Sequence, residues 1–148
     1  MSKKQKNKAT SFSLPKSAVN DAAVNFALPA NETSKRLYFS HRFICTRDFC
    51  IKKCSYEQFK SLADKLRILS ELEWKIIKSS PRETNGYEEI PVKQINGTLP
   101  NNFSNLDSVM IFRFGGGSRG GRIVGTLEEN RFYILFIDSK YNLYDHGS

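Results

Sequence analysis

The chain has 148 residues, of which 39% are apolar and 12% aromatic, and it carries a formal net charge of +8 at pH 7. This length suits one domain with a tail, and this composition supports a hydrophobic core, which excludes a wholly disordered chain. No apolar run approaches the roughly 20 residues of a membrane helix. No apolar segment follows the basic residues Met1–Thr10, as one would in a secretory signal. We therefore expect a cytoplasmic protein with no membrane partner.

The positive charge is unevenly distributed along the chain. Residues 1–35 contain six lysines and two acidic residues, a balance of +4, and residues 36–148 carry the other +4. Because neutralising phosphates releases counterions, a basic excess is typical of proteins that bind nucleic acid. Lys, Ser, Ala and Asn dominate the first segment, which also contains Pro15 and Pro29. We predict a basic, flexible N-terminal tail over 1–35 and a single compact domain over 36–148.

The first elements of the domain are a strand and a helix. Residues 37–44 are rich in aromatic side chains, which predicts a strand. Apolar residues then recur at steps of three and four over 56–69, which predicts a helix. Ser55 and Gln58 have the spacing of a capping box at its start. The apolar stripe predicted to be buried comprises Tyr56, Phe59, Leu62, Ala63, Leu66 and Leu69.

A second helix is predicted to follow the first at once. Ser70 and Glu73 repeat the capping-box spacing, and the helix should end before Pro81, because proline disfavours helical geometry in the residue before it. The region beyond is rich in turn signals, with a short strand over 88–95. Pro91 places that strand at a sheet edge.

The C-terminal third is predicted to be β-structure. Short connections favour an antiparallel meander, and the apolar run at 131–138 favours a central strand. The fold class is therefore α+β: an N-terminal strand, two consecutive helices and a meander packed on the helices. The strands are expected at 109–114, 122–127 and 131–138, with a short further piece at 140–144.

Histidine and cysteine side chains cluster after the first strand. His41, Cys45, Cys50 and Cys54 fall within 14 residues, and structural zinc takes four nitrogen or sulfur ligands. The spacing is unlike a zinc knuckle and contains no C-x2-C pair. An odd number of cysteines also fits reduced, partly buried thiols, which is the interpretation we favour.

Arginines surround a glycine-rich turn at 115–121. No Walker A lysine follows the turn, and a strand rather than a helix comes next, so it is not a nucleotide-binding loop of that kind. Its glycines allow close approach to a phosphate, although a flexible hairpin tip explains them equally well. Arginine recognises phosphate with two parallel hydrogen bonds, so an anionic site on the meander is a second hypothesis. The arginines concerned are Arg113, Arg119, Arg122 and Arg131.

The C-terminal residues add groups that can exchange protons or stack on bases. They are Tyr141, Tyr144, Asp145 and His146, and an ordinary polar tail is the alternative. Paired catalytic carboxylates are not evident, since the acidic pairs at 88–89 and 128–129 fall in expected turns. No motif for a metal or an organic cofactor appears, and we expect none.

The order of two helices and then a meander with arginines resembles the RelE/ParE superfamily of small toxins. Phe112-Arg113-Phe114, the strand that begins at Arg122, the apolar run 132–138 and Tyr144 are similar to its C-terminal pattern. The resemblance covers residues 36–146 and is architectural. The segment also looks like small uncharacterised proteins of bacterial genomes and mobile elements.

That resemblance implies a metal-independent endoribonuclease that acts on mRNA in the ribosome and is held by an antitoxin protein. By position, Arg113 and Arg122 would stabilise the scissile phosphate, and Tyr144 or His146 would act as base or acid. Further RNA contacts are expected from Arg119, Arg131, Lys60 and Arg67.

Three functions therefore remain open from the sequence. The first is an RNA-cleaving toxin that uses the arginine cluster. The second is a non-catalytic nucleic-acid-binding module, whose binding depends on salt. The third is a phage or plasmid factor whose basic tail docks on an acidic protein.

Overall fold

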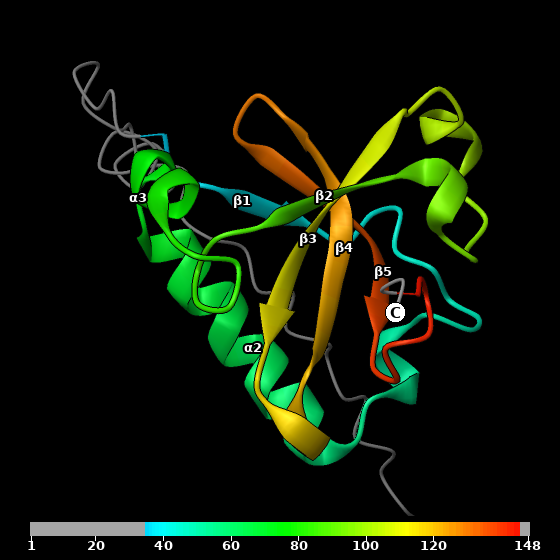
Figure 1. Cartoon of the computed structure of the whole chain (residues 1–148), viewed down its shortest axis with the longest axis horizontal. Helices are drawn as coiled ribbons and strands as arrows, with labels where there is room; N and C mark the ends of the chain where they lie inside the picture. The colour runs from blue at the N-terminus through cyan, green and yellow to red at the C-terminus, as the bar shows by residue number, and fades with distance from the viewer. Residues whose placement is uncertain (1–34, 146–148) are drawn as a thin grey trace, which may run out of the picture. The chain divides into compact units, whose positions relative to one another are not determined.

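A computed structural model of the protein describes residues 35–145 (Figure 1). The predicted tail, apart from Lys35, lies outside the described residues, and so does His146. The strands are β1 (Tyr38–Ser40), β2 (Glu88–Pro91), β3 (Ser108–Phe114), β4 (Gly121–Glu128) and β5 (Arg131–Asp138), and the helices are α2 (Tyr56–Glu71) and α3 (Trp74–Ser79). Short 3-10 helices lie at η1 (Ile51–Lys53), η2 (Val92–Gln94), η3 (Asn101–Phe103) and η4 (Gly117–Arg119).

The predicted α+β class is confirmed. The five strands form one sheet in the order β1-β5-β4-β3-β2. Strands β2 to β5 pair antiparallel as the predicted meander with its edge strand, whereas β1 pairs in parallel with β5. Both helices cover one face of this sheet (Figure 1). The N-terminal strand therefore closes the sheet on the side away from β2.

Helix α2 begins where the sequence predicts. The Ser55 hydroxyl accepts a hydrogen bond from the Gln58 backbone N–H (3.1 Å), and the Gln58 side chain accepts one from the Ser55 N–H (2.9 Å). This capping box satisfies two N–H groups that a helix start leaves without partners.

The buried stripe of α2 differs from the predicted one. Tyr56 and Phe59 are 74% and 48% exposed, and Ala63 is exposed as well. Leu62 and Leu69 are buried as predicted and Leu66 packs against the core, but the inward face also carries Gln58 and Lys65. Apolar periodicity misplaces the stripe because two of its buried members are polar. Their amide and ammonium groups have hydrogen-bond partners inside the fold, which offsets part of the cost of burial, although burial still lowers the pKa of Lys65.

The predicted cap of the second helix is wrong. Ser70 lies inside α2, and its hydroxyl donates to the Arg67 carbonyl (2.7 Å). Helix α3 starts after Glu73, which makes no side-chain capping bond. The Trp74 N–H donates to the Lys35 carbonyl instead (2.7 Å). A distant backbone group thus satisfies the helix start that a local serine was expected to satisfy.

Two of the predicted strands differ from the sheet. The first is shorter than 37–44, because the chain turns at His41, where the Ile44 N–H donates to the His41 carbonyl (3.2 Å). Residues 140–144 form a loop rather than a strand. The predicted edge strand containing Pro91 is confirmed as β2.

Both faces of the sheet are covered. The helix side holds Leu62, Leu69 and Ile77 against Phe112, Phe114 and Phe132. The opposite side holds Ile111, Val124, Leu135 and Phe136 against residues of the loops, including Leu143 and Tyr144. The register between β4 and β5 shifts at Val124/Gly125. The polar groups described next lie on this second face of the sheet and on the loops that cover it.

Candidate functional site

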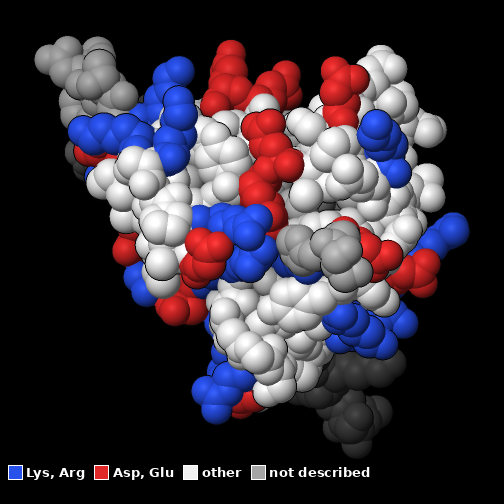
Figure 2. Space-filling model, in the orientation of Figure 1, with Lys and Arg blue, Asp and Glu red and all other residues white. Residues whose placement is uncertain are grey.

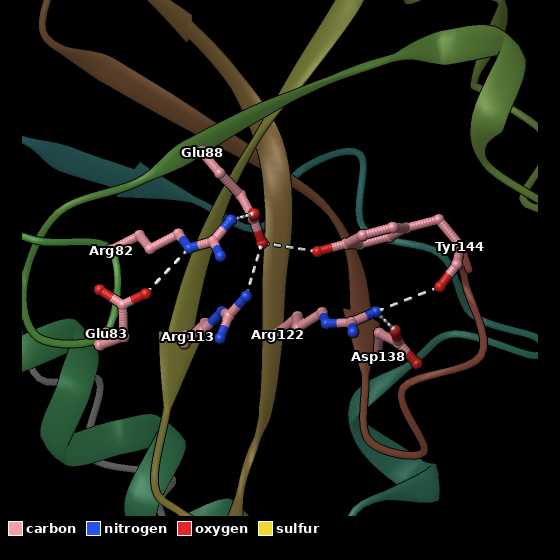
Figure 3. Close-up of polar contacts among 7 residues, drawn as sticks. All are labelled: Arg82, Glu83, Glu88, Arg113, Arg122, Asp138 and Tyr144. Atoms are coloured by element: carbon pink, nitrogen blue, oxygen red, sulfur yellow. Dashed lines mark hydrogen bonds and ion pairs between the residues drawn. The ribbon is translucent and has the colours of Figure 1, made fainter. Parts of the chain in front are cut away.

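The structure brings three of the four predicted catalytic residues together. Arg113 and Arg122 are directly opposed on β3 and β4. Both lie on the sheet face away from the helices, because neighbouring Phe112 and Phe114 fill the helix side. Tyr144 approaches the same face from the loop after β5 (Figure 3).

Arg122 is held by groups inside the protein. Its side chain is 5% exposed and its Nη1 lies 3.3 Å from Oδ2 of Asp138, which is 0% exposed. The same nitrogen lies 3.4 Å from the Tyr144 carbonyl oxygen. The guanidinium carbon also lies 4.1 Å from the Tyr144 ring centroid and 4.8 Å from that of Tyr141. The positive charge of Arg122 is thus paired with a buried carboxylate and lies close to two aromatic rings.

Glu88 on β2 organises the second half of this polar network (Figure 3). Its Oε1 accepts hydrogen bonds from the Tyr144 hydroxyl (2.7 Å) and from Arg113 Nη2 (3.3 Å). Its Oε2 accepts one from Arg82 Nη1 (2.9 Å). Burial by itself raises the pKa of Glu88, but these hydrogen bonds and the arginine charges outweigh it and lower the pKa. Glu88 is therefore ionised and shared by three donors.

Both arginines of this network already face carboxylates, and the Nε group of each is buried with no hydrogen-bond partner among residues 35–145. Burial, and then the hydrogen bond to Glu88, raise the pKa of Tyr144 well above its usual value, so its hydroxyl remains a protonated donor. Arg113 is 30% exposed but already faces Glu88. The network thus stabilises the sheet face and fixes the loop at Tyr144.

The other predicted contacts are dispersed. Arg131 lies beside Glu128, at the end of β5 opposite the Arg122–Asp138 pair, and donates to the Tyr133 hydroxyl (3.4 Å). Arg119 is exposed on η4. Lys60 and Arg67 lie on α2, which covers the other face of the sheet, and both form ion pairs within that helix.

The cysteines do not converge with His41. His41 is exposed, and Cys50 is buried with its thiol donating to the Arg47 carbonyl (3.1 Å). Cys45 and Cys54 pack against different hydrophobic clusters. Burial, and the nearby Cys50, raise the pKa of the Cys54 thiol. Within residues 35–145, no three His, Cys, Asp or Glu side chains are grouped as metal ligands.

The loop after β5 is positioned by buried side chains. Asp138 accepts hydrogen bonds from the N–H groups of Asn142 (3.1 Å) and Leu143 (3.2 Å). The Gln58 amide donates to the carbonyls of Ser139 (2.7 Å) and Gly120 (3.0 Å). Gln58, which completes the capping box of α2, therefore also joins the η4 turn to this loop.

A polar cleft of about 420 Å³ lies beside this loop. Its walls come from three separate segments: η1 with the residues before it, the turn at Asn96 and the loop after β5. The Ser139 hydroxyl donates to the Lys53 carbonyl (3.3 Å), and the Asn96 amide donates to the Asn142 carbonyl (3.0 Å). The lining residues are Asp48, Phe49, Lys53, Asn96, Ser139, Lys140 and Asn142.

The charged groups of the cleft are uncommitted. Among the described residues, the side chains of Lys53, Lys140 and Asp48 form neither an ion pair nor a hydrogen bond. Lys60, Arg67, Lys75 and Arg82 have carboxylate partners, whereas other described cations, including Arg47, Lys52 and Arg119, form no ion pair either. What distinguishes Lys53 and Lys140 is that both line one cleft. Figure 2 shows Lys and Arg side chains grouped near the loop after β5, and acidic side chains along the upper edge of the view.

Sequence reasoning did not identify this cleft. Lys53 and Lys140 are far apart in the chain, and the segment 45–53 has no clear periodicity. Two features of the sequence point to these segments: the consecutive lysines Lys52 and Lys53, and the polar loop after the last strand. Neither feature indicates that the two segments lie together in space.

Comparisons with protein-family models, curated proteins and solved structures find no match for this chain. Within residues 35–145, neither helix is long and apolar enough to cross a membrane. The site's own chemistry is therefore the basis for assigning a function.

Proposed function

We propose that this protein is a non-catalytic module that binds single-stranded RNA, with the polar cleft as the contact site. The observation that carries the proposal is the pair of uncommitted lysines, Lys53 and Lys140, in a cleft that Phe49 also lines. Lysine ammonium groups bind phosphates, and the counterions released make such binding favourable in a chain with a net charge of +8.

The composition of the cleft favours a single strand. Sequence-specific proteins usually recognise RNA through unstacked bases, which stack on aromatic rings and form hydrogen bonds along their edges. Phe49 is partly exposed and is held by an edge-on contact with Phe136, at a centroid distance of 6.1 Å. Asn142 adds a side-chain amide, whereas the amide nitrogen of Asn96 already donates to the Asn142 carbonyl (3.0 Å). The cleft thus offers groups that can contact the phosphate, the face of a base and the hydrogen-bonding edge of a base.

The state of the arginine network supports binding rather than cleavage. Of the two residues predicted to act as base or acid, Tyr144 already donates its hydroxyl to Glu88, and His146 lies outside the described residues. The phosphate contacts expected of these arginines are occupied by Glu88 and Asp138. The endoribonuclease function implied by the RelE/ParE resemblance, with its ribosome and antitoxin partners, stays a prediction.

Binding is tested with a fluorescently labelled single-stranded RNA of mixed sequence and fluorescence anisotropy. The double variant Lys53→Ala/Lys140→Ala should raise Kd by about tenfold or more, which corresponds to ~1.4 kcal/mol. A matched variant, Lys60→Ala/Lys75→Ala, removes the same charge from the helices, where both lysines are already paired. Equal losses in the two variants would show that only net charge matters and would overturn the cleft as the contact site.

Catalysis is tested separately by incubating the same RNA with the full chain in EDTA and analysing it on a denaturing gel. We expect intact RNA. Specific fragments that accumulate with time would favour the endoribonuclease prediction over the non-catalytic function.

A further inference from the structure

We propose that the cleft selects guanine, with the Asp48 carboxylate recognising the edge of the base. This inference rests on the proposed RNA-binding function and names the nucleotide that the cleft accepts. It starts from a residue that phosphate binding does not explain.

Asp48 is unfavourable in a site that binds only phosphate. A carboxylate repels a phosphate, and the carboxylate of Asp48, an exposed residue, has no ion-pair or hydrogen-bond partner among residues 35–145. It nevertheless lines the same cleft as Lys53 and Lys140. The ligand that suits all three must present hydrogen-bond donors to Asp48 and negative charge to the lysines. A nucleotide does both, because its base and its phosphate lie on opposite sides of the sugar.

The chemistry of the four bases then favours guanine. An ionised carboxylate has only acceptors, at two neighbouring oxygens. Guanine presents two neighbouring donors on its Watson–Crick edge, the N1–H and the 2-amino group, and can bind a carboxylate through both. Adenine, cytosine and uracil each place at least one acceptor beside their donor, and that acceptor would face a carboxylate oxygen. The remaining guanine acceptor, O6, suits an amide or ammonium donor such as Asn142 or Lys53.

The cleft has the other features that a base requires. Its volume of about 420 Å³ admits one nucleotide rather than a duplex. Phe49 lines the cleft and is partly exposed, and stacking on an aromatic ring contributes to binding for every base. Phe49 therefore supplies affinity without sequence preference, whereas Asp48 supplies the preference.

The test uses three labelled oligoadenylates that differ at one central position, which carries guanosine, inosine or adenosine. Inosine keeps the N1–H of guanosine and lacks its 2-amino group. The wild-type chain should bind the guanosine oligonucleotide roughly tenfold more tightly than the adenosine one, with inosine between them, since a good bidentate pair discriminates by about that much. The variant Asp48→Asn should bind all three within about twofold of one another. Its affinity for the adenosine oligonucleotide should be unchanged or higher.

Asp107→Asn is the matched control, because it makes the same charge change at an exposed residue outside the cleft; it should keep the preference for guanosine. Equal binding of the three oligonucleotides by the wild type, with sensitivity to Lys53→Ala/Lys140→Ala, would overturn the guanine assignment and leave the RNA-binding function intact. A guanosine preference that survives Asp48→Asn would overturn the role of Asp48. Absence of any RNA binding would overturn both proposals.

Discussion

At the scale of single residues, Asp138 connects the core to the cleft. One oxygen accepts the Asn142 N–H, and the other faces the Leu143 N–H and Arg122. Its position at the end of β5 was expected, but no local pattern names an arginine on the neighbouring strand as its partner. The carboxylate is fully buried, and these contacts supply its hydrogen-bond partners.

Replacing this carboxylate should destabilise the protein strongly. In Asp138→Asn the buried Arg122 loses its counter-charge, and breaking a buried ion pair on one side costs about 3–5 kcal/mol. Urea denaturation at pH 7 measures the free energy of unfolding. Asp64→Asn breaks an exposed ion pair on α2 and should cost less than about 1 kcal/mol. Similar losses in both variants would show that burial of the Arg122 pair is unimportant.

Glu88 predicts a dependence of stability on acid pH. Burial opposes ionisation, but the Tyr144 hydrogen bond and the arginines lower the pKa of Glu88 below its unfolded value. The stabilisation is therefore present above about pH 4.3, the ordinary glutamate pKa, and is lost as the pH falls through the lower folded value. The free energy of unfolding of the wild type should fall over this pH range, and its excess over the free energy of unfolding of Glu88→Gln should shrink. Urea denaturation of both proteins at a series of acid pH values measures these free energies.

The neighbouring Glu89→Gln provides the control for this titration. Glu89 is exposed and forms no ion pair within the described residues, so this variant should follow the wild-type curve. A difference between wild type and Glu88→Gln that stays constant from pH 7 to acid would contradict the argument.

At the scale of elements, Gln58 does more than cap a helix. Its amide oxygen completes the capping box, and its nitrogen holds two carbonyls, of Gly120 and Ser139, that belong to different loops. Sequence spacing identifies the first role correctly. The second role depends on which loops pack against the start of α2, and spacing carries no information about that.

The variant Gln58→Glu separates these two roles. Glutamate keeps the capping box but cannot donate to the carbonyls, so we expect a loss of about 2–3 kcal/mol in unfolding free energy. Ser55→Ala loses only the cap and should cost about 0.5–2 kcal/mol. Because Ser139 lines the cleft, Gln58→Glu should also weaken RNA binding, measured by anisotropy at a temperature where the variant is folded. RNA affinity unchanged in Gln58→Glu would show that this contact does not shape the cleft.

At the scale of the whole molecule, the net charge of +8 has to be separated into charges that are paired inside the protein and charges that are available to a partner. Several cations in the described residues are internally paired, including Arg113 and Arg122, two of the four sheet arginines on which the sequence interpretation relied. The unpaired lysines of the cleft are more relevant to an external anion than the total charge.

The salt dependence of RNA binding gives the number of phosphate contacts that the cleft lysines make. For a single strand, the slope of log K against log salt falls by about 0.7 for each phosphate contact removed. Lys53→Ala/Lys140→Ala should therefore reduce the magnitude of the slope by roughly 1.4. Anisotropy titrations at several salt concentrations measure it, with Lys60→Ala/Lys75→Ala as control. An unchanged slope in the cleft variant would mean that phosphates bind elsewhere.

The sequence by itself determined those features that depend on near neighbours in the chain. The capping box at Ser55, helix α2, the edge strand with Pro91 and the antiparallel meander all follow from local spacing and short connections. Tertiary structure alone decided the parallel pairing of β1 with β5, the buried polar side of α2 and the partners of Arg113 and Arg122. It also decided the cleft, whose walls are brought together from three distant segments. The physical reason is that hydrogen bonds and ion pairs form between groups that are close in space. The periodicity of one helix or strand does not say which groups of other elements will lie close to it.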